Sequence, residues 1–131
     1  MIQAWTIYSL EDGSIKSCIA SSEIGTVELN TPDGCAFVEG QSDPLRQAVI
    51  NGVIVDKPQD ELDAIEAELA YNSAFGQATS RRRELLYQSD WTQVPDAPVD
   101  QAAWAVYRQA LRDITLQEGF PFDITWPNPP A

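Results

Sequence analysis

The composition of the chain changes abruptly at Lys57-Pro58, and this change constrains what each side can fold into. Before it, glycine-containing turn signals recur about every ten residues and separate short runs of strand-forming residues. After it, residues 60–69 form a dense run of acidic and aliphatic side chains without a β-branched stretch. Frequent turns are typical of antiparallel strands, whereas the second kind of run favours a helix. The sequence therefore predicts an α+β chain with a small antiparallel β module at residues 1–57.

The strongest hairpin signal in this module is Asn51-Gly52. A type I′ turn needs positive φ at both central residues, and Asn followed by Gly adopts that conformation at little cost. A further turn is expected at Asp12-Gly13. The short runs between the turns are the predicted strands: Trp5–Leu10, Ile15–Ile19, Cys35–Val38, Ala48–Ile50 and Val53–Val55.

A long central helix is predicted from about residue 59 to residue 88, with Asp60 as its N-cap. Unbroken, it would be ~45 Å long. The middle of its apolar stripe is polar, so the helix either bends at Gly76 or completes its surface against a partner. The stripe follows alternating spacings of three and four: Leu62, Ile65, Leu69, Asn72, Gly76, Thr79, Arg83 and Leu86.

A short second helix and a C-terminal extended strand are predicted to follow. Two prolines exclude a helix interior over residues 90–98, and Asp100 is the expected N-cap of a helix that ends at Gly119. Residues 122–126 alternate between apolar and polar side chains, as a strand does. The chain is thus expected to have three parts, at residues 1–57, 58–88 and 89–131. The apolar face of the second helix consists of Trp104, Tyr107, Leu111 and Ile114.

Composition argues against most catalytic chemistry. The chain has no histidine, which removes the usual general base near neutral pH and the ordinary zinc sites. Its seven glycines are never closer than six residues apart, so no phosphate-binding loop can be drawn. The acidic cluster at residues 60–68 does not have the spacing of a calcium-binding loop. We therefore predict no enzymatic activity, no cofactor and no metal site.

Charge and hydropathy argue against two kinds of partner. Residues 1–80 carry 13 acids and three bases, and residues 81–131 carry seven acids and five bases, so no segment is basic enough to gather nucleic-acid phosphates. The longest apolar run, Ala102–Tyr107, is far shorter than the ~20 residues that span a membrane. In the absence of a secretory signal, we expect a cytoplasmic protein in which Cys18 and Cys35 are reduced, buried thiols.

Three unusual motifs follow one another within residues 82–127. They read D-W-T-Q-V-P-D-A-P at 90–98, W-A-V-Y-R-Q-A-L-R-D at 104–113, and G-F-P followed by W-P at 119–127. In order and spacing they closely resemble the C-terminal cassette of bacteriophage tail assembly chaperones of the tail fibre assembly type. The resemblance implies a small phage protein that helps a tail or tail fibre protein to fold and assemble, with no cofactor and no catalytic residue.

Two functions are therefore weighed. The leading hypothesis is a chaperone that binds a tail or fibre protein, a trimeric fibre in particular, in the host cytoplasm and assists its folding, trimerisation or attachment. The alternative is a stoichiometric structural subunit retained in the finished phage tail or fibre. An enzyme that cuts cell-wall glycan is a third class, supported by nothing more than an abundance of carboxylates. A second copy of the chain is a further partner left open.

The expected partner surface combines the polar middle of the long helix with the C-terminal strand. Both could be completed by another chain. A separate group of residues in the cassette is expected to be structural, because large rings at helical spacing usually pack into a core. The partner-binding residues are Asn72, Gly76, Thr79, Arg83, Phe122, Ile124 and Trp126. The structural cassette residues are Trp91, Trp104, Tyr107 and Leu111.

Overall fold

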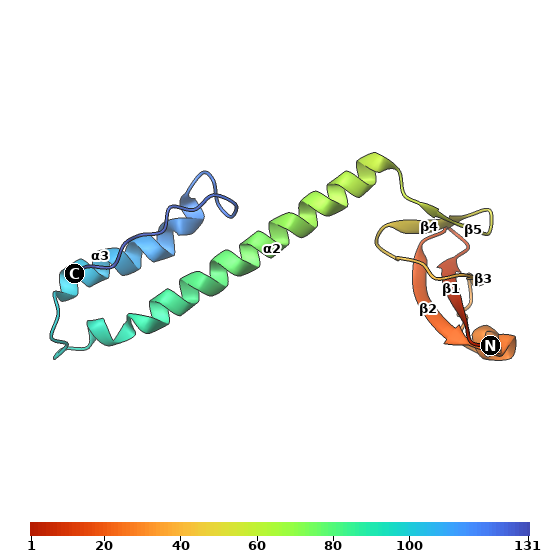
Figure 1. The fold of residues 1–131 in the computed structure, drawn as a ribbon, viewed down its shortest axis with the longest axis horizontal. Coiled ribbons are helices and arrows are strands. Elements are labelled where there is room, and N and C mark those ends of the chain that lie inside the picture. The colour runs from red at the N-terminus through yellow and green to blue at the C-terminus, as the bar shows by residue number, and fades with distance from the viewer. The chain divides into compact units, whose positions relative to one another are not determined.

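A computed structural model describes all 131 residues, which divide into two compact units, Met1–Glu66 and Ala67–Ala131. The α+β prediction is confirmed: all five strands lie in the first unit, and the second unit is helical (Figure 1). Helix α2 (Gln59–Gln88) begins in the first unit and ends in the second. None of the helices has the combination of length and apolar character needed to cross a membrane.

The first unit is organised around β1 (Gln3–Ser9), which is the central strand of a three-stranded antiparallel sheet. Strand β2 (Ile15–Ser21) pairs with one edge of β1, and β3 (Cys35–Glu39) pairs with the other. Ile7, in the middle of β1, is buried together with Val27. The predicted strands of this sheet are confirmed: β1 pairs with β2, its neighbour along the chain, and with the more distant β3.

A separate two-stranded hairpin is formed by β4 (Gln47–Ile50) and β5 (Val53–Asp56). Asn51 and Gly52 both have positive φ, of 52° and 74°, so the predicted turn is confirmed. Gly13 connects this hairpin to the sheet: its carbonyl accepts the N–H of Val49 at 2.9 Å. A side chain at Gly13 would collide with the Val49 carbonyl, so glycine is required at that position.

The sequence prediction missed one element of the first unit, the short helix α1 (Ile24–Leu29). The two cysteines are free, as predicted, but both are only half-buried. Partial burial raises the pKa of the Cys18 thiol, but hydrogen bonds with Ser42 and Thr6 outweigh it and leave the pKa below its usual value. No disulfide therefore holds this unit together.

In the second unit, α2 runs without interruption through Gly76. The helix begins at Gln59, which places Asp60 inside the first turn rather than at the N-cap. Helix α3 (Gln101–Arg112) follows a 3₁₀ turn, η1 (Asp90–Gln93).

The N-cap of α3 is Asp100, as predicted, and its carboxylate accepts the N–H of Ala103 at 3.1 Å. Helix α3 ends at Arg112 and continues as a second 3₁₀ turn, η2 (Asp113–Leu116), so the α-helix stops well before the predicted Gly119.

The C-terminal segment forms no β-strand, contrary to the prediction for residues 122–126. The side-chain amide of Gln117 takes the place of a neighbouring strand: its Nε2 donates to the Thr125 carbonyl at 2.9 Å, and its Oε1 accepts the Thr125 N–H at 2.8 Å. One side chain can satisfy the backbone N–H and C=O of only one residue. It therefore cannot continue the hydrogen bonding along the segment as a neighbouring strand would. Prolines at 121 and 127, which lack an N–H, further prevent strand pairing.

Candidate protein-binding surface

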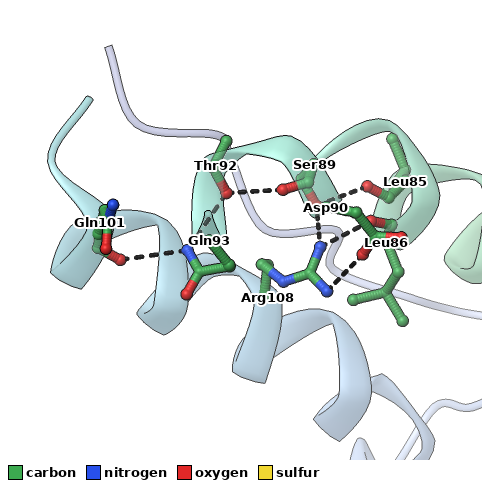
Figure 2. A network of polar contacts seen from close by, with 8 residues as sticks. All are labelled: Leu85, Leu86, Ser89, Asp90, Thr92, Gln93, Gln101 and Arg108. Carbon is green, nitrogen blue, oxygen red and sulfur yellow. Dashed lines mark hydrogen bonds and ion pairs between the residues drawn. The ribbon is translucent and has the colours of Figure 1, made fainter. Parts of the chain in front are cut away.

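The guanidinium of Arg108 connects α3 to the end of α2 (Figure 2). Its Nη1 donates to the Leu86 carbonyl at 2.6 Å and to the Ser89 hydroxyl at 2.7 Å, while Nη2 pairs with the Asp90 carboxylate at 2.7 Å. The Arg108 side chain is 11% exposed, whereas the Asp90 side chain is 59% exposed. Because an arginine fork is rigid and planar, these three bonds fix the angle between the two helices.

Further hydrogen bonds extend this network along the turn between the helices (Figure 2). The buried Thr92 hydroxyl donates to the Ser89 carbonyl at 2.6 Å. Gln93 donates to the Gln101 carbonyl at 3.3 Å, and the Gln101 amide in turn donates to the Val94 carbonyl. Three residues of the network, Asp90, Thr92 and Gln93, belong to the D-W-T-Q motif, and Arg108 belongs to the Y-R-Q motif. The motifs thus hold the helix–turn–helix framework in one geometry.

Apolar packing supports the same framework. Tyr107, Leu111 and Ile114 are buried, and Trp104 is half-buried with its ring edge-on to Tyr107 at 5.5 Å between centroids. Trp91 lies 6.3 Å from Trp104, yet half of its surface is exposed. Three of the four expected cassette residues therefore lie mainly inside the unit, and Trp91 lies at its edge.

The C-terminal segment runs back along the helices and forms one wall of a groove. The guanidinium of Arg81, on α2, lies over the Trp126 ring at 4.5 Å, which is a favourable cation–π distance. The groove encloses about 410 Å³. Its lining comes from α2 and from the C-terminal segment: Ala74, Gln77, Ala78, Arg81, Pro121, Phe122, Asp123, Ile124 and Trp126. We call this feature the C-terminal groove.

Four aromatic rings beside this groove contact one another in a chain. Tyr71 and Phe75, one turn apart on α2, are 6.2 Å apart; Tyr71 also contacts Phe122 at 6.1 Å, and Phe75 contacts Phe120 at 5.7 Å. Phe122 is 66% exposed, and Tyr71 and Phe75 are also exposed. We call these four residues the aromatic surface. Exposed apolar clusters of this kind mark sites that bind other proteins.

The structure separates the two halves of the predicted partner surface. Phe122, Ile124 and Trp126 line the C-terminal groove. The helical half lies roughly half a turn around α2 from the residues that line the groove. Asn72, Gly76 and Arg83 are exposed there, and Thr79 is half-buried. The sequence prediction missed Tyr71, Phe75 and Phe120, although aromatic residues four apart on a helix are a readable signal.

Replacing Gly76 with alanine is expected to stabilise the monomeric protein by about 0.5–1 kcal/mol, since a Cβ at this position would have nothing within 4 Å and alanine loses less entropy in a helix. Urea denaturation measures this. Gly119→Ala is the contrasting control, because its Cβ would lie 2.5 Å from the Asp123 carbonyl oxygen and should destabilise the protein. A loss of stability in Gly76→Ala that appears only as the protein concentration rises would show that another chain occupies this space.

A two-helix framework that presents exposed aromatic rings and an open groove is a candidate surface for binding another protein. Residues 77–131 match the family model described as phage tail assembly chaperone protein. The prediction of a C-terminal cassette of this family is therefore confirmed. No curated protein and no solved structure matches the chain significantly.

Proposed function

We propose that the protein binds a phage tail fibre protein through the aromatic surface and the C-terminal groove, and that it assists the folding, trimerisation or attachment of this client in the host cytoplasm. The family match supports a role in tail assembly. The observation that carries the proposal is the exposure of Phe122 at the junction of the two features: it contacts Tyr71 and lines the groove.

The chemistry of this region suits transient binding of an unfinished protein. Aromatic rings offer a large contact area at a low cost in conformational entropy, and the groove adds the Gln77 amide and the Arg81 guanidinium as polar groups. The Arg108 network keeps the helices behind this surface in place, so little ordering is required when the client binds. Binding alone performs this function, and no step requires a reactive side chain.

Co-expression with the tail fibre protein of the same phage tests the client site. Phe122→Ser should reduce the yield of soluble trimeric fibre by roughly tenfold, the loss expected for a central aromatic contact. Deletion of residues 119–131 should abolish the effect of the chaperone. Leu116→Ser is the matched control, because Leu116 is an 80% exposed apolar residue of the same unit that lies outside the aromatic surface and the groove.

Circular dichroism establishes that each variant is folded. If folded Phe122→Ser and the deletion rescue the fibre as well as the unaltered chain does, the aromatic surface is not the client site. Mass spectrometry of purified phage particles separates the chaperone from the alternative structural role. A chaperone that leaves is absent or strongly sub-stoichiometric, whereas a retained subunit is present in fixed proportion to the fibre.

A further inference from the structure

A second surface on α2 lies beside the aromatic surface of the client site. It consists of Leu69, Asn72, Gly76 and Thr79, which follow one another at spacings of three and four on one face of the helix, and we call it the α2 seam. Leu69 is 44% exposed, and Gly76 has open space above it. The seam lies on a different face of α2 from the residues that line the C-terminal groove.

The spacing of the seam is the same in both directions along the helix. Leu69 and Thr79 are equidistant from residue 74, and so are Asn72 and Gly76. Farther out on the same helix, Leu62 and Leu86 have this relation as well. In a pair of antiparallel α2 helices related by a two-fold axis at residue 74, each of these residues in one helix would therefore lie opposite its counterpart in the other. Alternation of three and four is the spacing at which two helices pack side by side.

Charges flanking the seam are related by nearly the same axis, since Glu68 and Arg82 lie six residues before and eight residues after residue 74. Glu68 and Arg82 lie on the same side of the seam, near its opposite ends, and neither forms an ion pair within the chain. Because they are 14 residues apart on one helix, about 21 Å, they cannot reach each other. An antiparallel copy would place Glu68 beside Arg82 of the second copy, and the reverse, so the surface is complementary to itself.

We propose that the α2 seam binds the α2 seam of a second copy, antiparallel and centred on residue 74, to form a two-fold homodimer. Gly76, which lacks a side chain, lets the two backbones approach closely where Asn72 of the second copy lies opposite. Leu69 supplies the apolar contact on each side of the axis. The polar central layers fix the register and direction of the pair at some cost in affinity, so the dimer forms in a concentration-dependent way.

Sedimentation equilibrium of the isolated full-length protein over a concentration series tests the dimer. The apparent mass should rise from 14.5 kDa toward twice that value. Glu68→Lys and Arg82→Glu, made separately, should each raise the dissociation constant roughly tenfold, because each places like charges together at two symmetric positions. The double variant Glu68→Lys/Arg82→Glu should restore wild-type affinity. This rescue arises only between chains, because the two residues are too far apart to pair within one helix.

Glu118→Lys and Arg112→Glu are the matched controls, since they make the same charge changes at exposed positions of the second unit away from the seam. Both should leave the dissociation constant unchanged. A mass of 14.5 kDa at every concentration overturns the proposal, as does a dimer that is indifferent to both single charge reversals. Failure of the double variant to regain affinity rejects the antiparallel pairing. If the protein is monomeric and the same reversals weaken recovery of the fibre, the dimer proposal is wrong and Glu68 and Arg82 belong to the client site beside Tyr71 and Phe75.

Discussion

Replacing Arg108 with methionine is expected to lower the free energy of unfolding of the second unit by about 2–4 kcal/mol. Methionine keeps the apolar stem but removes all three hydrogen bonds of the guanidinium. The Leu86 carbonyl and the buried Ser89 hydroxyl then lose a charged donor in a place that water reaches poorly. Asp90 loses less, because it is largely exposed and regains water.

Tryptophan fluorescence in a urea titration measures this effect, since three of the four tryptophans lie in the second unit. Arg112→Met is the matched control: Arg112 is exposed on the same helix and makes no ion pair, so its replacement should change stability by less than about 0.5 kcal/mol. Arg108→Lys should fall between the two, because an ammonium cannot reproduce the planar fork. Equal effects of Arg108→Met and Arg112→Met would mean that the network does not stabilise the unit.

Elements specified by local chemistry could be predicted from the sequence. The Asn51-Gly52 turn needs nothing beyond its own two residues to favour positive φ, and the structure has it. The cap of α3 is equally local, because Asp100 bonds to an N–H three residues away. The predicted boundaries of α2 are close for the same reason: helix formers fill residues 59–88 and proline ends the run on the N-terminal side.

Elements that depend on tertiary contacts could not be predicted. Helix α1 contains Ile24, Thr26 and Val27, whose branched side chains favour strands, and its N-cap makes no side-chain hydrogen bond. Burial of Val27 holds it helical despite these preferences. The alternation over residues 122–126 is a valid strand pattern, yet Gln117 satisfies the backbone of Thr125 and no second strand lies beside it.

The candidate site shows why a helical stripe can indicate the wrong packing face. In the sequence, the aliphatic stripe of α2 continues into Asn72 and Gly76, but the face that forms the groove contains Ala74 and Ala78. Alanine occurs at both exposed and buried helix positions, so it carries little information about burial. The aromatic surface was missed because its rings come from α2 and from the C-terminal segment, which meet only in the folded unit.

Leu111→Ala is expected to destabilise the second unit by about 3–5 kcal/mol, the cost of removing a fully buried side chain and leaving a cavity in the core. Leu111 and Ile114 are both fully buried, and few other apolar side chains of this unit are. The loss is comparable to the whole stability of a small domain. Urea denaturation followed by tryptophan fluorescence should therefore show a second unit that is largely unfolded even without denaturant.

Leu116→Ala removes the same atoms from an exposed position just beyond Leu111, so it should cost less than about 0.5 kcal/mol. The comparison also bears on client binding. A chain with an unfolded second unit cannot hold Phe75 against Phe120, so Leu111→Ala should fail to rescue the fibre although Leu111 itself is fully buried. A Leu111→Ala protein as stable as Leu116→Ala would mean that this unit is held together mainly by the Arg108 network rather than by its apolar core.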